Sequence, residues 1–125
     1  MSFICPGCDQ NSLKISFALE LPPSGDDDEI TVQIAKCAAC GLLGLAVYRE
    51  SRHGSLDSES WHHNGYVLSG KAMENLMEAL LACPAPRDRR CSCATHISLG
   101  KKDWAAVASN GIEVKRRFPM RWIRD

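Results

Sequence analysis

The sequence lacks any long apolar run, and this absence excludes a helix that spans a membrane. No stretch of its 125 residues approaches the roughly 20 consecutive apolar residues that such a helix needs. The opening residues 1–5 carry no basic group and no extended apolar segment, so we expect no secretory signal and a cytoplasmic location. Thiols stay reduced in the cytoplasm, where clustered cysteines indicate metal or redox chemistry before disulfides.

Common catalytic signatures and a net charge are also missing. The chain contains no His-Glu-x-x-His, Gly-x-Ser-x-Gly, phosphate-loop or zinc-deaminase pattern. Its 15 basic and 15 acidic residues cancel, but residues 1–60 carry a net charge of −5 and residues 61–125 carry +5. This asymmetry indicates either a basic binding face in the C-terminal half or two halves that attract each other.

The length of the chain favours a single domain over residues 1–125. We divide it into a first part at 1–50, a middle part at 51–68 and a last part at 69–125. The middle part is polar and turn-rich until a short apolar run at 66–68, which predicts a loop followed by a short strand.

Three strands are predicted in the first part. Strict alternation of apolar and polar residues over 13–21 places the apolar side chains on one face of a half-buried strand. Alternation recurs at 30–36, and the β-forming run at 42–48 predicts the third strand. The segment 22–29 is rich in Pro, Gly and Asp, so we expect a loop that joins the first two strands as an antiparallel hairpin.

The last part opens with one amphipathic helix. Ser69 stands at an N-cap position, apolar residues recur at helical spacing as far as Leu81, and Pro84 ends the helix. Further along, residues 103–109 fit either a short helix or a strand, and residues 112–118 are predicted to form a strand.

Four cysteines flank the predicted hairpin in the pattern C-x2-C-x28-C-x2-C: Cys5, Cys8, Cys37 and Cys40. An antiparallel hairpin brings the two pairs together, and the two-residue spacing lets both sulfurs of a tight turn face one ion, as a tetrahedral site requires. The Cys-Pro-Gly-Cys and Cys-Ala-Ala-Cys-Gly motifs on either side of a hairpin resemble a zinc ribbon over residues 3–50. The resemblance implies a three-stranded antiparallel fold around one structural zinc ion.

Two other thiol chemistries agree less well with these residues. The spacing is also similar to that of rubredoxin, an iron protein, but two regular strands with Phe17 as their single aromatic residue favour zinc over iron. The Cys-Pro-x-Cys motif resembles that of glutaredoxin-like proteins, whose thiol pair lies at a helix N-terminus. Here a strand follows the first pair, and a redox pair would leave the second pair without a role.

A second cluster follows the helix in the pattern C-x7-C-x-C-x2-H: Cys83, Cys91, Cys93 and His96. Three thiols and one imidazole form a common zinc set, so we predict a second zinc ion here. The alternative is that Cys83 is a small buried side chain and the other two thiols are incidental. Arg87, Arg89 and Arg90 lie between the ligands, where they either offset thiolate charge or grip phosphate or an acidic partner.

The expected fold is therefore a small α+β domain, made of a three-stranded antiparallel zinc ribbon, one amphipathic helix and a Cys/His-rich C-terminal segment. We expect a zinc-binding, non-enzymatic module for nucleic acid or a protein partner. The candidate binding surface consists of Arg87, Arg89 and Arg90 together with four basic residues and one aromatic residue near the end of the sequence: Lys115, Arg116, Arg117, Arg121 and Trp122. One alternative is a zinc-dependent enzyme with an open metal site at the three cysteines of the second cluster and His62, His63 or His96 nearby. Another is a purely structural subunit of an assembly.

Overall fold

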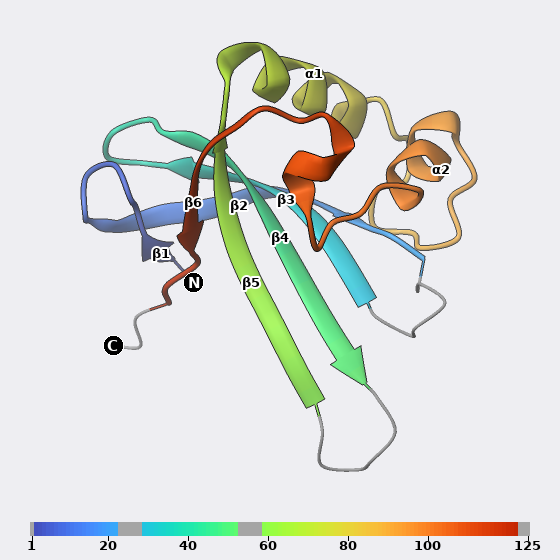
Figure 1. Cartoon of the computed structure of the whole chain (residues 1–125), viewed down its shortest axis with the longest axis horizontal. Helices are drawn as coiled ribbons and strands as arrows, with labels where there is room; N and C mark the ends of the chain where they lie inside the picture. Colours follow the sequence, from blue (N-terminus) through green and yellow to red (C-terminus); the bar gives the residue numbers. More distant parts are fainter. Residues whose placement is uncertain (1, 23–28, 53–58, 123–125) are drawn as a thin grey trace.

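The computed structural model describes residues 2–22, 29–52 and 59–122, with the backbone alone for 51–52 and 59–61. Its elements, in chain order, are β1 (Phe3–Ile4), β2 (Asn11–Glu20), β3 (Glu29–Cys37), β4 (Leu43–Arg52), β5 (Glu59–Leu68), α1 (Gly70–Leu81), α2 (Ala94–Gly100), a 3-10 helix (Val107–Asn110) and β6 (Val114–Pro119). Within the described residues the strands form one six-stranded antiparallel sheet, and neighbours in sequence are neighbours in the sheet (Figure 1).

The predicted fold of a three-stranded ribbon plus one helix is wrong. The three predicted strands exist, as β2, β3 and β4, but they belong to a larger sheet that curls into a half-barrel. The predicted loop over 51–65 is wrong at residues 51–52, which end β4, and at 59–65, which form most of β5. Residues 53–58 of this loop and most of the 22–29 loop lie outside the described residues. Polar residues suffice for β5 because β4 pairs with its backbone along residues 59–66 and β6 pairs with residues 64–68 on the other side.

The curl is closed at one end by contact between the two ends of the chain. Phe3 of β1 forms an isolated bridge with Trp122, and the Ile4 N–H donates to the Arg121 carbonyl at 2.9 Å. The first strand therefore pairs with β2 on one side and with the segment after β6 on the other. Side chains from opposite ends of the sheet meet on the concave face as a result.

The concave face, turned away from the helices, carries a smaller buried cluster that includes two small residues. Ala35 and Ala46 are fully buried there, packed in one cluster with Phe3, Leu13 and other side chains from β1, β2 and the β6 end. The opposite, convex face carries the larger core, which packs under α1, α2 and the 3-10 helix. The sheet is thus covered by helices on one side and partly filled by its own side chains on the other.

The alternating stripe of β2 does not stay on one face, contrary to the prediction. Leu13 and Ile15 pack into the concave cluster, whereas Leu19 packs into the core under the helices. The cause is a shift of register between Ile15 and Phe17, which leaves Ser16 as an extra residue against β3. A bulge of this kind reverses the face on which every later side chain lies.

The helical predictions agree better with the structure. Helix α1 spans Gly70–Leu81, and the Ser69 hydroxyl accepts from the Ala72 N–H at 3.2 Å, as the predicted N-cap should. Residues 103–106 form turns, and the 3-10 helix that follows ends at Gly111, whose φ is 79°. Among the described residues no helix is long and apolar enough to cross a membrane.

We expect substitution of Gly65 by Ala to destabilise the protein by about 1–3 kcal/mol, because the added methyl group would crowd the packed interior of the curled sheet. A Cβ at this position would lie 2.3 Å from two ring atoms of Phe118, which is buried and sits directly opposite across the β5–β6 pair. Gly70→Ala is the matched control, since a Cβ there meets nothing within 4 Å. Urea unfolding of both variants checks this, and equal effects at the two positions would contradict it.

Candidate metal centres

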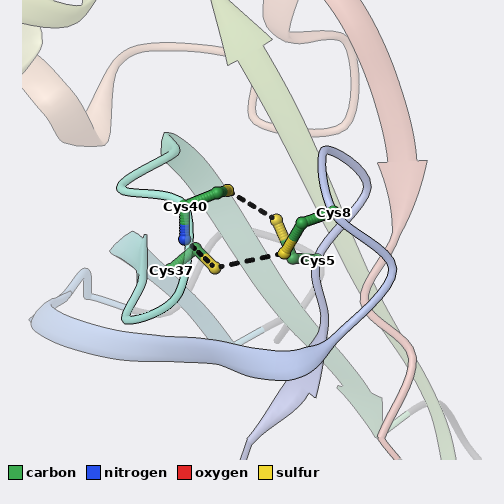
Figure 2. A group of neighbouring side chains, drawn as sticks. All are labelled: Cys5, Cys8, Cys37 and Cys40. Carbon is green, nitrogen blue, oxygen red and sulfur yellow. Dashed lines mark hydrogen bonds between the residues drawn. The ribbon is translucent and has the colours of Figure 1, made fainter.

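Two facing turns, which follow β1 and β3 at one end of the sheet, hold the first cluster (Figure 2). Cys5 directly follows β1 and Cys8 completes the next turn, while Cys37 ends β3 and Cys40 completes the turn that leads to β4. All four sulfurs lie within 4.8 Å of one another. The pairing of β2 with β3 brings the two turns together, as the hairpin argument predicted.

The sulfur positions match a tetrahedral metal site. Cys5 Sγ lies 3.6 Å from Cys40 Sγ, and Cys8 Sγ lies 3.7 Å from Cys37 Sγ. Metal–sulfur bonds of about 2.3 Å in a tetrahedron separate the sulfurs by about 3.8 Å. A disulfide would instead need a separation of about 2.05 Å. The four thiols can therefore hold one metal ion.

Backbone and hydroxyl donors point at two of the sulfurs, and those around Cys37 favour its thiolate form. The Gly7 N–H points at Cys5 Sγ, and the N–H groups of Ala39 and Cys40 point at Cys37 Sγ, each at 3.3 Å. The Ser12 hydroxyl lies 3.0 Å from Cys37 Sγ. This hydroxyl, followed by the Cys40 N–H, lowers the pKa of the Cys37 thiol to about 6. A thiolate so stabilised is ready to bind a cation.

The two turns share one backbone device. Gly41, directly after the second pair, has a φ of 78°, and Asp9, directly after the first pair, has a φ of 60°. This left-handed conformation reverses the chain after each turn, and Asp is among the residues that tolerate it best. Asp9 thus reverses the chain after the first pair as Gly41 does after the second.

The second cluster joins the end of α1 to the start of α2. Cys83 lies just beyond α1, Cys93 is the N-cap of α2, and His96 lies in the first turn of that helix. Cys83 Sγ is 3.7 Å from Cys91 Sγ and 3.3 Å from His96 Nδ1, and all four donor atoms lie within 4.8 Å of one another. These residues too can hold one metal ion.

The ring of His96 is oriented for this role by the backbone of β2. Its Nε2 donates to the Glu20 carbonyl at 2.7 Å, and the side chain is only 1% exposed. A proton on Nε2 leaves Nδ1 with a free lone pair that faces the cysteines. Such a hydrogen bond, which fixes the tautomer and the ring plane, commonly accompanies a metal-binding histidine.

Two of the three arginines between the ligands pair with a carboxylate. Arg89 and Arg87 lie 3.0 Å and 3.3 Å from the two carboxylate oxygens of Glu20. The Glu20 N–H also donates to the Pro86 carbonyl at 2.8 Å. These contacts tie the loop that carries Cys91 to the end of β2. Arg87 and Arg89 therefore have a positioning role, and Arg90 remains an exposed residue of the loop.

The other predicted residues are not ligands of either cluster, although Arg116 donates to the Pro6 carbonyl in the first turn at 3.2 Å. His62 and His63 are adjacent on β5 and belong to neither group of ligands found among the described residues. On β6 and the segment after it, the predicted basic surface is exposed: Lys115, Arg116, Arg117 and Arg121. Trp122 is 49% exposed.

Two residues that contact the clusters were not predicted from the sequence. Ser12 and Glu20 lie on β2, and each contacts a cluster because the strand passes both. Glu20 contacts His96 through its backbone carbonyl, a group that every residue has, so the residue type could not predict this contact. Ser12 stands four residues after a cysteine, a spacing that matches no ligand motif.

Comparison with known proteins identifies no relative. No protein-family model, no curated protein and no solved structure matches the chain.

Proposed function

We propose that this protein is a non-enzymatic, zinc-stabilised module that binds single-stranded nucleic acid. The observation that carries the proposal is that each cluster already supplies four protein donors. Four cysteines, or three cysteines and a histidine, form the donor sets typical of structural zinc sites, which are tetrahedral and closed. A catalytic zinc site keeps one position for water or substrate, and neither donor set leaves such a position.

The positions of the clusters support a structural role. The first joins the turn after β1 to the turn after β3, which are far apart in sequence. The second joins the two helices and, through His96 and Glu20, attaches them to the end of β2. Two ions would thus hold a small curled sheet and its helical cover in place, and leave the remaining surface for binding.

The nucleic-acid surface that we propose lies along β6 and the residues after it. Phe118 and Met120 are buried, so they anchor this segment and are not available for stacking. The exposed basic side chains and the half-exposed Trp122 supply the two contacts that single strands need, namely phosphate neutralisation and base stacking. Arg87 and Arg89 are left out of this surface because they pair with Glu20.

We expect a single-stranded oligonucleotide to bind with an affinity that falls steeply with salt, with a log–log slope of about −0.7 per phosphate contact. Arg116 and Arg117 point to opposite faces of β6: the first bonds to the Pro6 carbonyl at 3.2 Å, and the second lines a hollow beside Val107. If the strand follows the face that holds Trp122, Arg116→Glu weakens binding more than Arg117→Glu does.

Fluorescence anisotropy at several salt concentrations measures both effects. Lys71→Glu, an exposed position on α1, is the control that changes charge elsewhere. Absence of binding to single strands at low salt would reject nucleic acid as the ligand and leave an acidic protein surface as the partner. Equal losses for all three variants would show that net charge alone drives the binding.

A further inference from the structure

A cavity of about 620 Å³ opens on the concave face of the sheet, apart from both metal clusters. Its walls are mainly aromatic and come from distant parts of the chain, including Phe3, Tyr48, His63 and Trp122, with the Gln33 amide between them. The volume falls within the range of about 300–1,000 Å³ that is typical of small-molecule sites. None of the lining residues is an acid, a lysine or an arginine.

A polar pair lies in this aromatic wall. His63 Nε2 and Gln33 Oε1 are 2.7 Å apart, so the imidazole donates to the amide oxygen. Burial lowers the pKa of His63 to about 4, which keeps the ring neutral at pH 7. Its Nδ1 is then an acceptor, and the Gln33 amide still has two N–H donors. Among the described residues, no other side-chain hydrogen bond of either group is found.

Two aromatic rings pack directly against His63. The His63 ring meets Phe3 and Tyr48 edge-on, at centroid distances of 5.2 Å and 5.5 Å and with interplanar angles of 89° in both cases. The backbone of Trp122 is fixed by its bridge to Phe3, while its side chain stays 49% exposed. A preorganised site of this kind loses little conformational entropy when a ligand enters.

The chemistry of the walls narrows the class of ligand. A purely aliphatic ligand would bury the Gln33 donor and the His63 acceptor without partners, which is costly. A charged ligand would lose its hydration without meeting an opposite charge. An uncharged planar ring that bears both an acceptor and a donor satisfies the polar pair and stacks on aromatic neighbours.

We propose that this cavity binds one uncharged nucleobase, stacked on the aromatic wall and hydrogen-bonded to Gln33 and His63. The choice of a nucleobase among heteroaromatic rings rests on the proposed nucleic-acid function. The base comes either from a free nucleoside or from a single strand whose phosphates lie outside the cavity, along β6. The cavity would then bind one base of the nucleic acid, and the basic residues along β6 would bind its phosphates.

Nuclear magnetic resonance titrations of the ¹⁵N-labelled, zinc-loaded chain test this. The probes are the four common ribonucleosides, a mixed-sequence DNA hexamer and a hexamer of the same length made of abasic residues. The expected shifts fall on the indole N–H of Trp122 and on the His63 ring. The indole of Trp104 is the internal control, because it is 2% exposed and donates to the Leu99 carbonyl at 2.9 Å in the helix-covered core.

Two variants with the same substitution separate the cavity from the rest of the surface. Gln33→Leu removes the amide donor and should weaken binding about tenfold, as loss of one hydrogen bond predicts. Gln10→Leu makes the same change at an exposed position in the turn after the first cysteine pair, outside the cavity. Unchanged zinc content and melting temperature show that each variant is folded. Equal binding by the two variants would overturn the proposal.

The probes also distinguish failure of this proposal from failure of the proposed function. An abasic hexamer that binds as tightly as the normal hexamer would uphold nucleic-acid binding through phosphates and reject the base cavity. Nucleosides that shift Trp122 and His63, with no binding of either hexamer, would support the cavity and reject the nucleic-acid function. No shift at Trp122 or His63 with any probe would reject the cavity as a nucleobase site.

Discussion

Replacement of Cys37 by Ser is expected to remove one metal ion per chain and to unfold the sheet. Cys37 is 1% exposed, and its sulfur lies in the four-donor cluster, 3.7 Å from Cys8 Sγ. Structural zinc contributes an apparent binding free energy of about 10–16 kcal/mol. This is comparable to the total stability of about 5–15 kcal/mol that is typical of a domain. Elemental analysis and circular dichroism measure the two losses, and we expect the ion to be zinc.

Ser12→Ala provides a graded companion to this variant. It keeps all four thiols and removes only the hydroxyl that lies 3.0 Å from Cys37 Sγ. Loss of such a supporting hydrogen bond typically lowers metal affinity about 10- to 100-fold, so the protein should stay folded when zinc is in excess. A Cys37→Ser protein with full metal content and full stability would refute the first metal site, and iron in the purified protein would refute zinc.

Replacement of His96 by Ala is expected to lower the metal content from two ions per chain to one. The substitution removes the Nδ1 donor beside Cys83 and the hydrogen bond to the Glu20 carbonyl in one step. We expect α2 and the loop before it to detach from β2, while the sheet and the first site persist. The loss of a buried metal and its anchoring contact should lower the melting temperature by about 10 °C or more, since it costs several kcal/mol.

Ile97→Ala is the matched control for this variant. Ile97 follows His96 on the same short helix but is 49% exposed, so its truncation should change neither metal content nor the docking of α2. Cys91→Ser should give the same result as His96→Ala if both residues bind one ion. One ion per chain in the unaltered protein, retained in both variants, would mean that the second cluster binds no metal.

The features that could be predicted from sequence are those with a short-range signature. Alternation of side chains defines β2 and β3, and helical spacing with Ser69 as the N-cap defines α1. The spacing of the cysteines predicted both groups of donors that the fold brings together. Each of these signals arises within a few residues, because strand pleat, helix pitch and ligand turns are all local properties of the backbone.

The tertiary structure decided the features that depend on pairing between distant segments. Strand β5 is polar enough to be taken for a loop, and it forms because β4 and β6 accept and donate its backbone hydrogen bonds. The bulge at Ser16 divides one apolar stripe between two cores, a change that no alternation in the sequence announces. The aromatic cavity exists because Phe3 meets Trp122 and curls the sheet, so that Gln33 and His63, thirty residues apart, share one wall.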